Sequence, residues 1–258
     1  MTAIRTAGFN CPKLLNSQMT QDFAYTLFLI LQLGNEVPKV QIKHYIQKWF
    51  VLSTLTGRYI GSPESQMDRD LRGIASKGFV QFLKENEDAL LSDTFWSVRL
   101  VQNLETTSVT SPYYSTYLAA QAFNKENSLL SNCIHVGDLF RSAGDVHHIF
   151  PKEYLKKSGI TDKSAYNQVA NYAYLDTGVN ISISDKAPSD YFVTALHQCE
   201  TGEMKIGTII DEKEFWENLS ENCIPAEIIR MTAADYQQFL QKRRAMMAMK
   251  IKEYYYSL

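Results

Sequence analysis

The sequence predicts an α+β fold that is mostly α-helical, with one small strand–strand–helix unit embedded in a helical body. Apolar residues recur at helical spacing in several stretches, and glycine or proline often stands at their ends, which predicts the helical body. A short apolar stretch, 145–150, contains a histidine pair, and a second one, 172–175, lies between two asparagines; together they predict the small unit. We therefore divide the chain into a helical region 1–140, a functional segment 141–200 and a C-terminal helical region 201–258 that packs on the rest.

Length and composition are those of a soluble globular protein. The 258 residues are enough to bury a sizeable core, and 45% apolar with 21% charged residues is ordinary. The formal net charge is −2, so binding to nucleic acid would have to come from local positive patches and not from an overall field. The four cysteines are widely separated and form no CxxC pair, which favours free thiols over a zinc knuckle or a disulfide framework.

The N-terminal residues lack the apolar core of a signal peptide, and the longest apolar run, roughly 23–33, is too short to span a bilayer. We therefore expect a cytoplasmic protein with no membrane partner.

The N-terminal part predicts two packed helices followed by a third. Residues 20–33 carry apolar side chains at helical spacing and are followed by Gly34 as a stop signal. Pro38 opens a second helix, and we expect the two to form a helical hairpin. The third helix begins near Ser62, a suitable N-cap, with Pro63 at its first position.

Residues 79–140 look mainly helical, with a Ser/Thr-rich break at 106–115. Aromatic side chains in this stretch have two interpretations, stacking on nucleic-acid bases or, more commonly, packing in the core; they are Tyr113, Tyr114, Tyr117 and Phe123.

Two more helices are expected further along the chain. The segment from Pro188 to His197 reads as the helix of the small unit, with Ser184 or Asp185 as its cap. A long helix follows from Ala233 onward, and its basic residues are interpreted either as a solvated face or as phosphate contacts.

The chemistry of the chain concentrates in residues 145–151, which read DVHHIFP, and in two asparagines downstream. Imidazole is the commonest metal ligand in proteins, and its unperturbed pKa lies near neutrality. One of the adjacent histidines, His147 and His148, is therefore suited to hold a metal while its neighbour moves a proton. Asn171 and Asn180 follow, separated by an apolar strand candidate.

This arrangement resembles the HNH, or ββα-metal, nuclease motif, residue by residue. His147 takes the place of the first metal ligand of that motif, and His148 that of the general base. Asn171 stands where a middle asparagine braces the catalytic loop, and Asn180 where the last residue of the motif binds the metal.

The flanking residues are similar to one branch of this family. His148 to Lys152 and Asn180 to Tyr191 look like the nuclease part of the GmrSD-type modification-dependent restriction enzymes and their anti-phage relatives. The resemblance implies a metal-dependent DNA endonuclease in a bacterial restriction or defence system. It implies a divalent cation, most simply Mg²⁺, although a histidine–asparagine site also suits Mn²⁺ and other transition metals.

Several further residues are candidates for the same site. Asp145 is either a third metal ligand or a group that orients an imidazole. Lys186 is a candidate phosphate contact, and Lys152 is a weaker one. In the C-terminal helix, Arg243 and Arg244 are candidates for binding the DNA backbone.

The resemblance also implies a partner. Enzymes of this type usually couple the nuclease to an N-terminal nucleotide-hydrolysing domain, and no Gly-rich phosphate-binding loop is present in this chain. That domain or subunit, and the recognition of a modification such as glucosylated hydroxymethylcytosine or phosphorothioate, is therefore expected elsewhere. Two alternatives stay open: a catalytically inactive nucleic-acid-binding or assembly module with a vestigial site, and RNA as the substrate.

Overall fold

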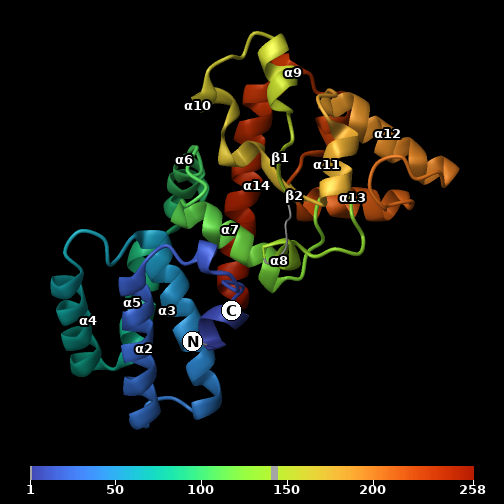
Figure 1. The fold of residues 1–258 in the computed structure, drawn as a ribbon. Coiled ribbons are helices and arrows are strands. Elements are labelled where there is room, and N and C mark those ends of the chain that lie inside the picture. Colours follow the sequence, from blue (N-terminus) through green and yellow to red (C-terminus); the bar gives the residue numbers. More distant parts are fainter. Residues whose placement is uncertain (1, 141–144) are drawn as a thin grey trace.

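The structure, a computed structural model, describes residues 2–140 and 145–258, with the side chain of Asp145 left aside (Figure 1). Most of these residues lie in helices. The strands β1 (Asp145–His148) and β2 (Tyr172–Leu175) form a two-stranded sheet. The expectation of a mostly helical fold with a small amount of β-structure is therefore confirmed.

The N-terminal region is a group of helices at the lower left of Figure 1. Gly34 follows the second helix as expected, and this helix packs against the third. Pro38 does not open that third helix, because a 3-10 turn at Lys39–Gln41 comes first. Ser62 occupies the N-cap position before Pro63, but its side chain makes no capping hydrogen bond. The helices are α1 (Thr2–Thr6), α2 (Gln18–Leu33), α3 (Ile42–Thr56), α4 (Pro63–Lys77) and α5 (Phe79–Leu90).

The middle of the chain is helical, as expected, and the Ser/Thr-rich break ends where Pro112 begins a new helix. Tyr114 and Tyr117 are 2% and 1% exposed, so these two aromatic side chains are core residues and not stacking platforms. The elements are the π-helix η3 (Phe95–Arg99) and the helices α6 (Leu100–Asn103), α7 (Pro112–Phe123) and α8 (Val136–Leu139).

The functional segment contains more helices than expected. Two short helices, α9 (Lys152–Lys157) and α10 (Lys163–Tyr166), lie between the strands in sequence. After β2 the chain forms a separate helix, α11 (Thr177–Ile183), before the expected α12 (Pro188–Thr201). The helix expected from Pro188 is therefore present as α12, but Asn180 lies on the separate helix α11.

Local capping explains the extra helix α11. The Asp176 side chain accepts a hydrogen bond from the backbone N–H of Gly178, which caps the start of the helix. At the other end Ser184 has a positive φ of 54°, which ends the helix because such a conformation cannot continue it. Ser184 therefore terminates α11 and does not cap α12, whose N-cap is Ala187.

The chain continues through α13 (Glu212–Glu221) to the long helix α14 (Tyr236–Ser257), drawn in red through the middle of Figure 1. A helix from Ala233 onward was expected, and a short 3-10 turn at Ala233–Asp235 leads into it. α14 packs against α7, α6 and η3, and the buried apolar side chains form one continuous core. α14 also contacts the 3-10 turn Val169–Asn171, so it links the segment that precedes β2 to the helical body.

Within residues 2–140 and 145–258, no helix combines the length and the apolar character needed to cross a membrane. All four cysteines are free thiols, as expected from their spacing.

Candidate active site

Strand pairing places the histidine pair on opposite faces of a small antiparallel sheet. His147 is paired with Ala173, and His148 with Tyr172. Successive side chains of a strand point to opposite faces, so the two imidazoles differ in surroundings. His147 is only 4% exposed, whereas His148 is half-buried.

Asn171 lies fully buried at the start of β2 and holds the chain that follows His148. Its side-chain oxygen accepts a hydrogen bond from the backbone N–H of Phe150 at 2.9 Å. Its amide N–H donates to the carbonyls of Phe150 at 3.1 Å and Tyr166 at 3.2 Å. Its own carbonyl accepts from the N–H of Ile149 at 2.8 Å. These are the backbone contacts that a brace for the histidine loop requires.

Helix α11 brings Asn180 to His147. The Asn180 side-chain oxygen lies 2.8 Å from Nδ1 of His147, across 33 residues of sequence. Nε2 of His147 is buried and has no hydrogen-bond partner among the described residues. Among the described residues the imidazole is therefore held by a hydrogen bond at Nδ1 alone.

His148 is held by a residue that the sequence analysis did not identify. Its Nε2 lies 3.0 Å from the side-chain oxygen of Asn167, which follows α10. The ring also meets Tyr172 edge-on, with centroids 4.9 Å apart and an interplanar angle of 88°. No sequence signal marks Asn167, because its role depends on how α10 folds back beside β1.

These groups line a cleft of about 310 Å³ bordered by α9, β1 and α11, elements that lie in the upper part of Figure 1. The cleft is polar and open, and it brings both histidines together with Asn180. Its lining residues are Val146, His147, His148, Pro151, Lys152, Glu153, Asn180, Ser184 and Asp185.

Burial keeps both imidazoles neutral at physiological pH. Loss of hydration lowers the pKa of His147 from 6.5 to about 4; the hydrogen bond with Asn180 opposes this and the nearby His148 adds to it. The pKa of His148 is also lowered, chiefly by burial, with the bond to Asn167 opposing the shift and Lys152 adding to it. A neutral imidazole is the form that binds a metal or accepts a proton.

Of the candidate lysines, Lys152 lines the cleft and Lys186 does not. Lys152 lies over the Tyr166 ring, 5.8 Å from its centroid, and forms no ion pair with the described residues. Lys186 is exposed, and its ammonium donates to the Ser182 carbonyl at 2.8 Å. Lys152, the weaker candidate in the sequence, is therefore the better placed of the two.

The candidate arginines of α14 are buried, so the expectation that they are exposed to DNA is wrong. Arg243 is 1% exposed, and its guanidinium donates to the backbone carbonyls of Ala170, Tyr172 and Asn222. Arg244 is 6% exposed and pairs with Glu105 at 3.3 Å. Arg243 instead fixes the start of β2 to α14.

The remaining metal candidate is Asp145, whose backbone pairs with Leu175 in the sheet. Its side chain lies outside the described part of the structure. Within the described part there is no group of three or more His, Cys, Asp or Glu side chains suited to a metal. Among the described side chains, a metal here would be held by His147 and Asn180.

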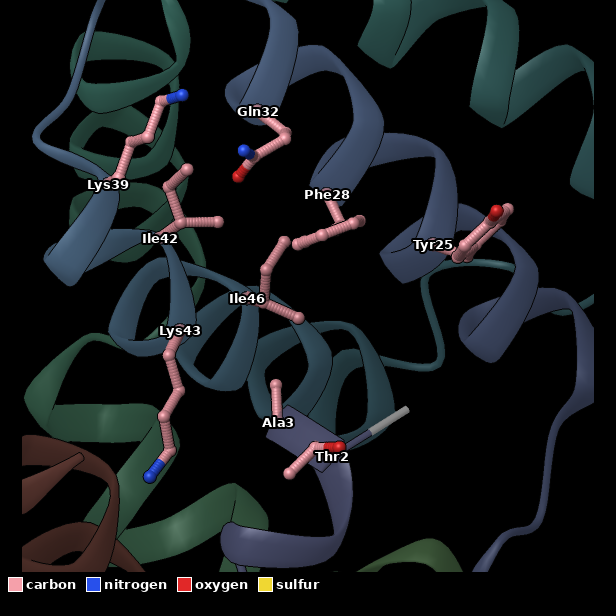
Figure 2. A pocket seen from close by; sticks show the side chains of 9 residues that line it. All are labelled: Thr2, Ala3, Tyr25, Phe28, Gln32, Lys39, Ile42, Lys43 and Ile46. Atoms are coloured by element: carbon pink, nitrogen blue, oxygen red, sulfur yellow. The ribbon is translucent and has the colours of Figure 1, made fainter.

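A second pocket, of about 330 Å³, lies between α1, α2 and α3 in the N-terminal region. Figure 2 shows the apolar side chains of Phe28, Ile42 and Ile46 facing one another there. Its lining, all within the described residues, carries two lysines but no imidazole, thiol or carboxylate. It therefore lacks the usual metal ligands and a group that titrates near neutrality, and the cleft at β1 is the better candidate site.

Comparisons of this chain with protein-family models, with curated proteins and with solved structures found no match. The resemblance to the HNH motif therefore depends on the residues quoted above and on their arrangement.

Proposed function

We propose that this chain is a metal-dependent endonuclease of the HNH type that hydrolyses DNA phosphodiester bonds. One observation carries the proposal: two neutral imidazoles and Asn180 meet in an open polar cleft, on a strand–strand–helix unit braced by Asn171. Both the order of these residues along the chain and their positions around the cleft support this proposal.

The His147–Asn180 pair fits a divalent cation. Nδ1 of His147 and the side-chain oxygen of Asn180 lie 2.8 Å apart, and burial favours the neutral imidazole that ligation needs. Without a metal Nδ1 donates to the Asn180 oxygen, so a bound cation would replace this hydrogen bond, with the ring proton on Nε2 instead. When bound, a divalent cation would neutralise charge on the phosphate and on the leaving oxygen.

His148 acts as the general base. Its ring lines the cleft, and its lowered pKa keeps it unprotonated at neutral pH, ready to take a proton from the attacking water. Lys152 binds a phosphate oxygen beside it, since it is the cleft-lining lysine without an ion pair among the described residues. Asn171 acts indirectly, by fixing the backbone after His148.

DNA as the substrate, and a role in restriction or defence against phage, follow from the sequence resemblance. The same resemblance supports a nucleotide-hydrolysing partner domain or subunit that reads the DNA modification. Cleavage of DNA and RNA of the same sequence in direct competition tests the substrate class; a preference for RNA would contradict this part of the proposal.

Nicking of supercoiled plasmid tests the activity. We expect cleavage with Mg²⁺ or Mn²⁺, none in EDTA, and a 10²- to 10⁴-fold lower rate in His148→Ala, roughly the contribution of a general base. His197→Ala is the matched control, because His197 is an exposed histidine on α12 that pairs with Glu200 outside the cleft. Full activity in His148→Ala, or cleavage in EDTA, would overturn the proposal. Binding of DNA without cleavage under any metal would favour the inactive binding module.

A further inference from the structure

Asn167 makes one side-chain contact of consequence, and it is to His148. It follows α10, and its backbone N–H donates to the Lys163 carbonyl at 3.0 Å. Its side-chain oxygen lies 3.0 Å from Nε2 of His148. The Asn167 side chain makes no other hydrogen bond among the described residues, so His148 is its sole hydrogen-bond partner there.

The identity of the contacting atoms determines where the imidazole carries its proton. An amide oxygen only accepts hydrogen bonds, so Nε2 of His148 must donate. A neutral imidazole has one N–H and one lone pair, so the lone pair is then on Nδ1. Nδ1 makes no hydrogen bond to the described residues, and the ring lines the cleft. This tautomer leaves a free acceptor for a water molecule in the cleft.

The segment that carries Asn167 is itself fixed from two sides. The Tyr236 hydroxyl, on α14, donates to the Ala165 carbonyl at 3.0 Å. The Asn171 amide donates to the Tyr166 carbonyl at 3.2 Å. The backbone before Asn167 is therefore held both by α14 and by Asn171, which allows the amide to define the plane of the His148 ring.

We propose that Asn167 is a positioning residue that holds His148 in the Nε2–H tautomer, with the lone pair of Nδ1 directed to the attacking water. This inference rests on the proposed nuclease function. In the step it serves, an O–H bond of water breaks and an Nδ1–H bond forms. The water oxygen keeps the electron pair and attacks phosphorus, and the leaving oxygen departs with the pair from its P–O bond. The Nε2–H bond to Asn167 persists throughout, which stabilises the imidazolium that forms.

The tautomer can be measured without any cleavage assay. In protein with ¹⁵N-labelled histidine, the two ring nitrogens have distinct chemical shifts, and His148→Ala identifies the signals by their loss. We expect the Nε2–H tautomer in the unmodified chain and in Asn167→Asp, which keeps an accepting oxygen. In Asn167→Leu we expect shifts averaged between tautomers. An Nδ1–H tautomer in the unmodified chain would overturn the proposal.

Kinetics supply the second readout. We expect Asn167→Leu to lower kcat for plasmid nicking by about ten- to a hundredfold, the usual cost of losing an orienting partner, with KM changed less than about twofold. Asn167→Asp should recover most of kcat. Asn124→Leu is the control, because Asn124 also follows a helix, α7, and is exposed. Unchanged kcat in Asn167→Leu would overturn the role. If the unmodified chain and all variants fail to cleave while the His148 tautomer still depends on Asn167, the proposed function is overturned and the positioning role is not.

Discussion

Two buried polar clusters, one in each half of the chain, differ in how completely their hydrogen bonds are satisfied. In the N-terminal region Asp70 is 1% exposed and is bound by both arms of the Arg58 guanidinium at 2.6 and 2.7 Å. It also accepts from the Tyr59 hydroxyl at 2.9 Å and from Gln66 at 2.8 Å. We call these residues the Asp70 cluster.

At the cleft, His147 is nearly as buried, but only one ring nitrogen has a partner, Asn180. The Asp70 cluster is complete in itself, and the pKa of Tyr59 is raised by burial and by the adjacent Asp70, which keeps the phenol protonated. A buried polar group without a partner costs free energy, whereas a satisfied network fixes the fold. The contrast supports a structural role for the first cluster and agrees with the binding role that we propose for His147.

The largest effect on stability is expected at the Asp70 cluster. Asp70→Asn keeps the shape but leaves the Arg58 charge buried without a counterion, which should lower the free energy of unfolding by about 3–5 kcal/mol. Urea denaturation measures it. Asp68→Asn, on the same helix in an exposed pair with Arg72, should cost less than about 1 kcal/mol. An equal loss of unfolding free energy in the two variants would contradict the structural role of the Asp70 cluster.

A pH dependence is expected at His147. The folded pKa of about 4 lies below the unfolded value of 6.5, so the unfolded chain gains a proton first as the pH falls. Stability is therefore full above pH 6.5 and is lost between pH 6.5 and 4, by about 3 kcal/mol. Denaturation in EDTA across this range measures it. His147→Leu should flatten the curve, while His197→Leu should not; parallel curves for all three proteins would refute the assignment.

A smaller effect is expected for DNA binding. In a His148→Ala background, which prevents cleavage, Lys152→Ala should raise the Kd for a DNA duplex about three- to tenfold, or ~1 kcal/mol. The slope of log Kd against log salt should fall by about 1, as expected for one lost phosphate contact. Lys186→Ala should change both quantities less, because Lys186 is outside the cleft lining. A larger effect of Lys186→Ala than of Lys152→Ala on Kd and on the salt slope would identify Lys186 as the phosphate contact.

The smallest stability change is expected where the hydrogen bonding is incomplete. His147→Leu replaces a poorly satisfied ring with an apolar side chain of similar size, so metal-free stability at pH 7.5 should change by less than about 1 kcal/mol. Plasmid cleavage should nevertheless be lost. A stability loss as large as that of Asp70→Asn would show that His147, too, is structural.

Much of this architecture follows from local sequence. Apolar periodicity and the stop at Gly34 predicted α2. Residue order pointed to His147 and Asn180, which lie within hydrogen-bond distance, and to Asn171, which binds the backbone after His148. Arg243 was misjudged because an arginine in a basic helix normally faces solvent; here backbone carbonyls from two distant segments satisfy it. The role of Asn167 depends on a contact between distant segments, and the end of α11 depends on the positive φ of Ser184. The spacing of residues in the sequence reveals neither.

The position of Arg243 on α14 also affects when the site is completed during synthesis. Its guanidinium donates to the Tyr172 carbonyl across 71 residues of chain. At 5–20 residues per second, roughly 4–14 s pass between translation of the strand and translation of this arginine. During that interval the start of β2 has no guanidinium to bind its carbonyls, and the cleft lacks its support from α14. During this interval the nascent chain therefore carries an unfinished site, and we expect the cleft to take its final form only after α14 has docked.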